Sequence, residues 1–422
     1  MTQNLEDIAK KLSTPVTTTT IKSTETRPIE PKEVQKTKPV PKIQLIYAFN
    51  GTGKTRLSRE MKDLIAPTSD DEDGSLARQK YLYYSAFTED LFYWKNDLDL
   101  DEDRKMVIQP NSFTDWILRD RGQETNIVTN FQRYTSESIT PSFPPEVKVE
   151  RQGDRSIRTQ THPEVRFSYR GGETLTENIK ISKGEESNLI WSIFYTLLQE
   201  VIAGKQDGED DEFNELEYIF IDDPVSSLDD SHLIELAVDL AGLIKSSVSD
   251  LKFVITTHNP LFYNVLFNEL GNSLDVEVAG ENKRIYSAKQ SKKYRLTKHE
   301  DGTFELDEQS DDHPFSYHLF LLEELRKAVE TNDIKKYHFS FLRNILEKTA
   351  TFLGHKKWAY LLPKIDGDPD PFANRLANLA SHSAHSGEEV AELDTNDKEK
   401  LGELVNYLFS HYHFFKPKDQ DA

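Results

Sequence analysis

Short apolar runs alternate with helical patterns along the first part of the chain. Residues 43–49, 218–221 and 251–256 are almost continuously apolar, which is typical of strands that a sheet buries on both faces. Between the last two runs, residues 233–244 repeat their apolar positions at helical spacing. Strands that alternate with helices in this way predict an α/β core.

The pattern changes in the last third of the chain. Short strands at residues 294–297 and 303–306 flank the turn residues Asp301 and Gly302, as in a hairpin. Helical spacing then dominates, in segments at residues 317–331, 337–353 and 398–414. We therefore predict a mostly helical second domain, with its boundary between about residues 265 and 315.

The N-terminal part combines a short amphipathic helix at residues 2–14 with a polar stretch at residues 14–42. Thr, Pro, Lys and Glu dominate this stretch, a composition typical of a solvated, flexible tether. The chain is thus predicted to contain an N-terminal helix with a tether, an α/β domain and a helical domain, at residues 1–40, 41–270 and 271–422.

Composition narrows the chemistry. The 422 residues include no cysteine, which excludes disulfides, thiolate metal sites and a cysteine nucleophile. Neither a secretory signal nor an apolar run long enough to cross a bilayer is found, so we expect a cytoplasmic protein that does not bind membranes. A formal net charge of -21 repels polyanions, so any nucleic-acid site must be a local basic surface.

A glycine-rich loop joins the first predicted strand to a helix that begins near Lys54. Its glycines let backbone N–H groups turn toward phosphate oxygens, Lys54 supplies positive charge, and the Thr55 hydroxyl suits Mg²⁺. The alternative is a glycine-rich turn of another α/β fold. The predicted nucleotide-binding residues of this loop are Asn50, Gly51, Thr52, Gly53, Lys54 and Thr55.

Two carboxylates end the apolar strand at residues 218–221. Asp222 is predicted to hold Mg²⁺ and Asp223 to polarise the attacking water, although two acids after an apolar run also occur where a strand end meets solvent. Together with Asp229 and His258, the order resembles the Walker B motif, D-loop and H-loop of the ABC ATPase family. Most members have Glu where Asp223 stands, so the shorter side chain suggests slow hydrolysis.

The segment at residues 181–186 is similar to the ABC signature, with Lys183 in place of its first glycine. In that family the segment caps a nucleotide held by another subunit. The resemblance therefore implies that Ser182 and Gly184 contact nucleotide in a head-to-tail homodimer or a higher homo-oligomer. Ser182 and Glu185 also have the spacing of a helix capping box, and both interpretations are compatible.

The helical domain holds a second set of candidate residues. Arg343 and Glu347 lie four residues apart and so share a helix face, where such a pair is commonly a surface salt bridge. His382 and His385 follow in a small polar segment; they suit a metal site, but clear third and fourth ligands are lacking.

Almost the entire chain resembles the PrrC family of bacterial anticodon nucleases. The resemblance rests on segments at residues 44–50, 86–94, 182–188, 221–229, 315–319, 342–350 and 381–383. It implies a fold in which an ABC-type P-loop NTPase domain precedes a mostly α-helical, HEPN-like ribonuclease domain. The family's catalytic Arg, Glu and His correspond to Arg343, Glu347 and His382. Its tRNA-recognition peptide lies just before Phe315, where Asp311 or Asp312 is the matching acid.

These residue types fit RNA cleavage without a metal at the nuclease site. The 2′-OH attacks phosphorus, with Glu347 as base, His382 as acid and Arg343 on the phosphate, while the roles of base and acid are exchangeable. The resemblance also implies ATP or GTP with Mg²⁺, held at Thr55 and Asp222, and dTTP as a regulatory nucleotide. It further implies cleavage of tRNA-Lys 5′ of the wobble base, a type I restriction-modification complex that keeps the nuclease latent, and a phage-encoded activator.

A basic stretch at residues 283–298 contains no acid and is interleaved with Tyr286 and Tyr294. We expect Lys292 and Lys293 to contact tRNA phosphates. The alternative is a solvated hairpin edge that lysines protect from pairing.

Three other functions compete with this interpretation. They are a DNA-end-sensing ATPase, against which the absence of a long heptad run counts, a metal-dependent DNA nuclease fused to an ATPase, and a nucleotide-switched scaffold in phage defence.

Overall fold

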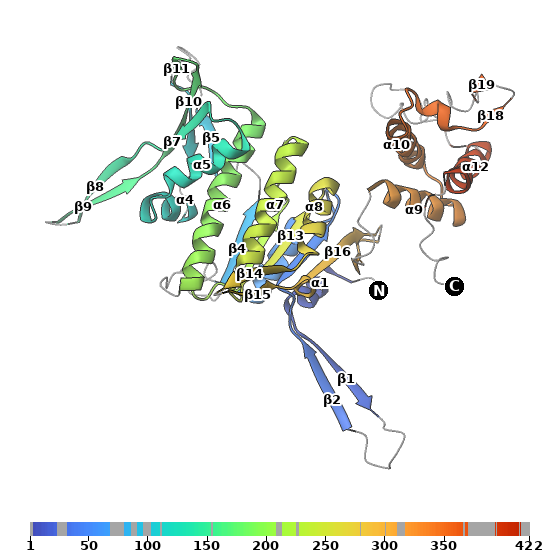
Figure 1. The fold of residues 1–422 in the computed structure, drawn as a ribbon, viewed down its shortest axis with the longest axis horizontal. Helices are drawn as coiled ribbons and strands as arrows, with labels where there is room; N and C mark the ends of the chain where they lie inside the picture. The colour runs from blue at the N-terminus through green and yellow to red at the C-terminus, as the bar shows by residue number, and fades with distance from the viewer. Residues whose placement is uncertain are drawn as a thin grey trace. The chain divides into compact units, whose positions relative to one another are not determined.

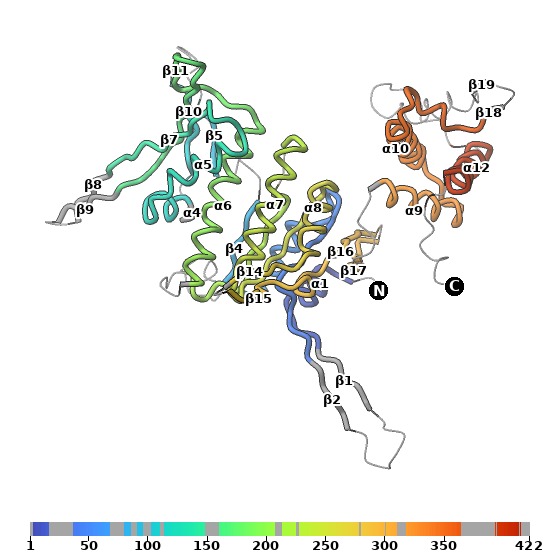
Figure 2. Tube along the Cα trace, in the orientation of Figure 1, coloured from blue at the N-terminus to red at the C-terminus, as the bar shows by residue number. Residues whose placement is uncertain are grey.

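Two compact units make up the chain, Met1–Pro314 and Phe315–Ala422, and each is described separately. Figures 1 and 2 show the computed structural model. It describes residues 3–22, 32–67, 80–85, 91–95, 103–109, 112–152, 155–207, 213–224, 228–278, 280–299, 301–309, 317–365, 368–369, 393, 395–412 and 414.

A six-stranded sheet forms the centre of the first unit, in the order β17-β16-β3-β13-β12-β4. All its strands are parallel except β17, which pairs antiparallel with β16. Their bounds are β3 Ile43–Tyr47, β4 Tyr81–Ser85, β12 Tyr218–Asp222, β13 Lys252–Thr257, β16 Ser291–Lys298 and β17 Phe304–Glu308. Every residue of β3 and β12 is buried, which confirms the predicted α/β core.

Helices cover both faces of this sheet (Figure 1). Leu57 and Met61 of α2 pack with Ile46, Phe220 and Val254 on one face. Helices α7 and α8 pack together, and α8 contacts β3 and β13. The helices that accompany the sheet are α2 Lys54–Ile65, α6 Lys183–Asp207, α7 Asp230–Ser246 and α8 Pro260–Leu270.

A smaller antiparallel sheet is inserted between β4 and α6, with strand order β11-β10-β6-β5 and β7 beside β10. It comprises β5 Phe92–Lys95, β6 Lys105–Ile108, β7 Ile139–Ser142, β10 Glu164–Gly171 and β11 Thr174–Thr176. The same insertion contains helix α4 Ser112–Asp115, a π-helical turn Trp116–Asp120, helix α5 Glu124–Tyr134 and the hairpin of β8 Glu146–Gln152 and β9 Arg155–Thr161.

The N-terminal helix is α1 Leu5–Ser13, and its buried face packs against α2. The polar stretch after it was predicted to be a flexible tether, and this prediction is wrong. It forms a hairpin of β1 Val16–Lys22 and β2 Lys32–Lys38. Most of β1 is threonine or β-branched aliphatic, and such residues favour strands whatever the overall polarity.

Residues 271–309 were predicted to belong to the tRNA-binding domain, but they lie in the first unit. They form the pair β14 Leu274–Val278 and β15 Glu281–Tyr286, a short 3-10 helix at Ala288–Gln290, and strands β16 and β17. Because β16 pairs along the whole of β3, the sheet around the phosphate loop is complete only with this segment.

The second unit is helical, as predicted. It contains α9 Tyr317–Glu330, α10 Lys336–Phe352, a 3-10 turn Trp358–Leu361, the two-residue strands β18 Lys364–Ile365 and β19 Asp368–Pro369, and α12 Thr395–His411. Leu325, Leu342, Leu346 and Leu401 are fully buried in its core. None of the described helices has an apolar stretch long enough to cross a lipid bilayer.

Removal of buried volume from α1 tests how much this helix stabilises the first unit. Ile8 is fully buried against α2 and the sheet, so Ile8→Ala is expected to lower the free energy of unfolding by about 2–5 kcal/mol in urea titrations. Glu6 lies on the exposed face, where it pairs with Lys10, and Glu6→Ala is expected to cost less than about 0.5 kcal/mol. Equal losses for the two variants would contradict this packing.

Candidate functional site

The register of three parallel strands brings the candidate nucleotide residues together. Tyr47 of β3 is opposite Thr257 of β13, and Thr256 of β13 is opposite Asp222 of β12. Since the carboxyl ends of parallel strands lie at one edge of a sheet, the phosphate loop, the Walker B carboxylates and His258 all meet there.

The phosphate loop follows β3 and leads directly into α2. Gly51 and Gly53 adopt positive φ angles of 78° and 103°, which favour glycine. Lys54, the first residue of α2, is largely buried. Its ammonium group donates to the carbonyl of Ala48 at 3.3 Å and to Asn50 Oδ1 at 3.2 Å. A lysine held over the loop in this way is positioned to contact a bound phosphate.

Asp222 is buried at the end of β12 and accepts hydrogen bonds from three hydroxyl groups. Thr55 Oγ1 lies 2.7 Å and Tyr83 Oη 3.1 Å from its Oδ2, and Thr256 Oγ1 lies 2.7 Å from Oδ1. The hydroxyl of Thr55 and the carboxylate of Asp222 are hard oxygen donors of the kind that Mg²⁺ prefers. These two residues therefore fit the predicted magnesium site.

Asp223 is held by groups of three different elements. Its carboxylate hydrogen-bonds to His258 Nδ1, accepts from Thr257 Oγ1 at 3.2 Å, and lies 3.5 Å from Lys54 Nζ. Burial opposes ionisation, but the His258 hydrogen bonds and the Lys54 charge outweigh it and lower the pKa of Asp223. Its φ of 52° is rare for a non-glycine residue, and such conformations concentrate at functional sites.

Tyr83 and Thr256 were not identified as site residues from the sequence. Tyr83 lies in β4, the strand beside β12, and burial raises the pKa of its hydroxyl to about 12, with the Asp222 charge adding to the shift. Thr256 is opposite Asp222 in the β12–β13 pair, and Tyr83 is two residues before Ser85, the β4 partner of Asp222. Tyr83 and Thr256 can be found only when the order of the strands in the sheet is known, and the sequence alone does not give that order.

The signature residues lie at the start of α6. Ser182 and Glu185 form the expected capping box, with Ser182 N donating to Glu185 Oε2 at 2.6 Å and Glu185 N to Ser182 Oγ at 3.3 Å. Gly184 follows within the first turn of the helix. The buried carboxylate of Glu186 accepts from Trp94 Nε1 at 2.7 Å, which fixes this end of α6 to the inserted sheet.

Asp229 caps the next helix. Its side chain accepts from the backbone N–H of His232 at 3.1 Å and sets the start of α7.

Arg343 and Glu347 lie on α10 of the second unit. Arg343 Nε donates to Glu347 Oε1 at 2.8 Å, and both side chains are partly exposed, 34% and 46%. His318 of α9 lies close to this helix; burial, with the nearby Lys348 charge, lowers the pKa of His318 and favours the neutral imidazole. His382, Asp311 and Asp312 lie outside the described residues.

Within the basic stretch at residues 283–298, Lys293 was expected to contact tRNA phosphates, but its side chain is buried. Lys293 is 2% exposed and its ammonium lies 4.8 Å from the centre of the Phe267 ring. Lys292 pairs with Glu308, an acid of the neighbouring strand β17. Arg284 and Arg295 pair with acids in the same way, and Tyr286 and Tyr294 are buried. Residues 283–298 contain no acidic residue, but the neighbouring strands β14 and β17 supply the acids that pair with their basic side chains.

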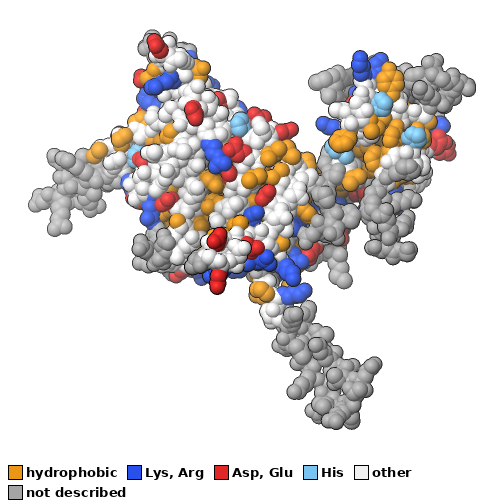
Figure 3. All heavy atoms as spheres, in the orientation of Figure 1, with side chains coloured by type: hydrophobic (Ala, Val, Ile, Leu, Met, Phe, Trp, Pro, Cys, Tyr) orange, Lys and Arg blue, Asp and Glu red, His pale blue; other side chains and the backbone are white. Residues whose placement is uncertain are grey.

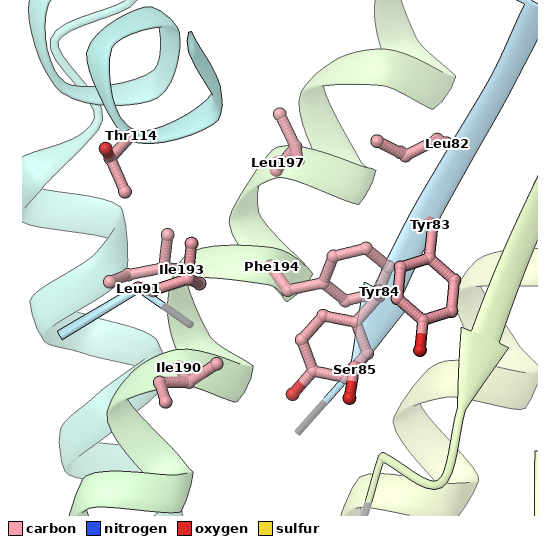
Figure 4. A pocket seen from close by; sticks show the side chains of 10 residues that line it. All are labelled: Leu82, Tyr83, Tyr84, Ser85, Leu91, Thr114, Ile190, Ile193, Phe194 and Leu197. Carbon is pink, nitrogen blue, oxygen red and sulfur yellow. The ribbon is translucent and has the colours of Figure 1, made fainter. Parts of the chain in front are cut away.

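An apolar cavity of about 150 Å³ lies between β4 and α6 (Figure 4). The stacked rings of Tyr84 and Phe194, with centroids 4.0 Å apart, line it together with Ile190 and Ile193. Tyr84 is next to Tyr83 in β4, and the hydroxyl of Tyr83 contacts Asp222 of the nucleotide site. Its apolar lining does not suit a triphosphate.

Comparisons with known proteins identify the family. A model of an AAA domain matches residues 163–410. The anticodon nuclease of Escherichia coli is 46% identical over 440 residues, and the match covers 100% of both chains. The chain belongs to the anticodon nuclease family. This family member has an NTPase domain, as shown by its phosphate loop, its Walker B strand and the match to the AAA-domain model.

Two solved structures match this chain at much lower sequence identity than the E. coli protein. A complex of the Smc head with a winged-helix domain of ScpA is 12% identical; the match covers 66% of this chain and 93% of that chain, with a TM-score of 0.31. The SMC head domain from Thermotoga maritima is 15% identical, with 64% and 90% covered and a TM-score of 0.25. Scores this low support no argument about the anticodon nuclease.

In this anticodon nuclease family member, Thr55 provides a test of the nucleotide site. Thr55→Val keeps the shape of the side chain but removes the hydroxyl that contacts Asp222. We expect binding of Mg²⁺–ATP or Mg²⁺–GTP, measured by calorimetry, to weaken about 10- to 150-fold, the equivalent of a hydrogen bond to a charged group. Thr55→Ser keeps the hydroxyl and should bind normally. Unchanged binding by Thr55→Val would argue against this site.

Proposed function

We propose that this protein is a nucleotide-regulated nuclease that cleaves tRNA in the anticodon loop. The observation that carries the proposal is the full-length match to the E. coli anticodon nuclease, at 46% identity. The Arg343–Glu347 pair on the solvent side of α10 supports it, because both groups are accessible to a large substrate.

The cleavage step uses the neighbouring ribose hydroxyl as nucleophile. Glu347 takes the proton of the 2′-OH, the 2′-oxygen forms a bond to phosphorus, and the bond from phosphorus to the 5′-oxygen breaks. His382 gives a proton to the leaving 5′-oxygen, and the roles of Glu347 and His382 are exchangeable. Arg343 stabilises the negative charge on the phosphoryl oxygens. The products are a 2′,3′-cyclic phosphate and a 5′-OH, and no metal ion takes part.

The observed ion pair suits this mechanism. A guanidinium has five N–H donors, so Arg343 can keep its 2.8 Å contact to Glu347 and still bind a phosphate.

The NTPase domain regulates the nuclease. ATP or GTP occupies the phosphate loop, where the residues present at Thr55 and Asp222 suit Mg²⁺, which neutralises phosphate charge when bound. Asp223 orients water for hydrolysis and His258 contacts the γ-phosphate. Ser182, Gly184 and Asp229 contact nucleotide across a homodimer, and dTTP is an additional regulatory ligand.

The substrate and partners follow from the family resemblance. We propose tRNA-Lys, cut 5′ of the wobble base, with Asp311 or Asp312 contacting the anticodon loop. A type I restriction-modification complex keeps the nuclease latent in the cytoplasm, and a phage-encoded product activates it.

Cleavage of tRNA with mapped product ends tests the mechanism. With ATP or GTP and Mg²⁺ preloaded and EDTA then added, we expect cuts in the anticodon loop that leave a 2′,3′-cyclic phosphate. His382→Ala should remove cleavage but leave nucleotide binding intact, whereas Lys54→Ala should impair activation. A tRNA with 2′-deoxyribose at the cut position should resist cleavage. Efficient cutting of that tRNA would exclude 2′-OH attack.

Hydrolysis of the nucleotide provides a separate test. Asp223 is held by Lys54 and His258, and its side chain is short, so we expect slow release of phosphate. Asp223→Ala should reduce that rate about 100-fold or more, the usual contribution of a positioned base, while nucleotide still binds. Hydrolysis by Asp223→Ala at the wild-type rate would assign the water-orienting role to another residue.

A further inference from the structure

The end of α10 exposes an aromatic ring to solvent. Phe352 is 94% exposed, the largest exposed fraction among the large hydrophobic residues that the structure describes. Leu353, which follows it, is 50% exposed, and Tyr360, eight residues further on, is 54% exposed. Apolar side chains kept in water at neighbouring positions are typical of a binding surface.

The backbone fixes Phe352 in this position. Gly354 adopts a φ of 75°, and the N–H of His355 donates to the carbonyl of Ala350 at 2.8 Å, so α10 ends in a tight left-handed turn. Because Ala350 is buried in the helical core, the last turn of α10 is anchored and Phe352 points away from the core. A backbone that is already fixed loses little conformational entropy when a ligand binds beside it.

Three lysines lie close to Phe352 in the sequence. Lys348, Lys356 and Lys357 are exposed, and within the described ranges none of them forms a salt bridge with an acidic side chain. This local excess of lysines contrasts with the net charge of -21 of the chain. On the face drawn in Figure 3, hydrophobic side chains of this unit lie beside Lys, Arg and His side chains.

The same helix carries the candidate catalytic pair. Residues four apart on a helix share a face, so Lys348 and Phe352 lie in one row, while Glu347 is turned about 140° from Phe352 around the helix axis. At 1.5 Å per residue, Phe352 lies about 7.5 Å along the axis from Glu347. The exposed ring and Glu347 thus lie within two turns of one helix, on different flanks of its exposed side.

We propose that Phe352, Tyr360, Lys348, Lys356 and Lys357 form the surface that holds the anticodon loop of tRNA against helix α10, the helix that also carries Arg343 and Glu347. This inference rests on the proposed function and names the surface that positions its substrate. Anticodon-loop bases are unpaired, and such bases stack on exposed aromatic rings while lysines bind the flanking phosphates. The combination of lysines with aromatic rings favours single-stranded RNA over a protein partner, for which the centre of a surface is usually depleted in lysine.

Substitution of the ring tests the stacking. Phe352→Ala is expected to raise the KM for unfractionated tRNA about 5- to 150-fold with little change in kcat, because stacking on one base contributes in this range. Phe352→Trp should restore the wild-type KM. Tyr337→Ala is the matched control: Tyr337 is 48% exposed on the first turn of the same helix, about 22 Å away, and its removal should leave KM unchanged.

The lysines are tested by salt dependence. For Lys356→Ala with Lys357→Ala, the plot of log Kd against log salt should become shallower by about 0.7 for each phosphate that a lysine no longer neutralises. Kd is measured by fluorescence anisotropy with tRNA that carries 2′-deoxyribose at the cut position. The anisotropy measurement requires no cleavage, so it tests the proposed surface even if the protein has no nuclease activity.

The outcomes separate the two proposals. Wild-type cleavage together with unchanged KM and Kd in Phe352→Ala would overturn the surface and leave the proposed function intact. Absence of tRNA cleavage by the wild type would count against the proposed function alone, provided that Phe352→Ala still weakens binding. A change in oligomeric state by sedimentation, with KM and Kd unaltered, would instead identify a protein interface and overturn the inference.

Discussion

The parallel pairing of β3, β13 and β12 is the constraint on which the nucleotide site depends. Each strand ends in a different functional group, and only their common direction and register place the three ends within hydrogen-bonding distance. Lys54 then reaches Asp223, and Thr55 reaches Asp222, across more than 160 residues of sequence. A slip of one residue in the pairing would turn strand side chains such as Asp222 and Thr256 to the opposite face of the sheet.

Asp223 illustrates how tightly this edge is built. Its carboxylate contacts a residue of the phosphate loop helix and one that follows β13, while its own backbone is held in a left-handed conformation. A shift of α2, of the segment that follows β13, or of the Asp223 backbone therefore alters the positions of the other two. Such shared dependence is what a site needs if the presence of a γ-phosphate is to change the conformation of a whole domain.

The parts of the fold that local patterns determine could be predicted from the sequence. The buried strands at residues 43–47 and 218–222 were found from their apolar runs, and α9, α10 and α12 from helical spacing. The phosphate loop, Asp222, Asp223 and His258 were recognisable because their spacing is tied to strand ends. Residues 271–309 were misplaced because β16 pairs with β3, a partner about 250 residues away. Lys293 looked like a surface charge because its partner, the Phe267 ring, lies on α8 rather than in the same strand.

The order of the strands also affects how this chain folds during synthesis. The sheet edge next to β3 stays open until β16 and β17 leave the ribosome, and Gln3 near the N-terminus pairs with Phe304 only at that stage. Once residue 309 has emerged, every described strand of the central sheet is available, while the helical unit is still incomplete. A ribosome that stalls before α10 is made therefore leaves a fragment that holds the strands of the central sheet but lacks Arg343 and Glu347.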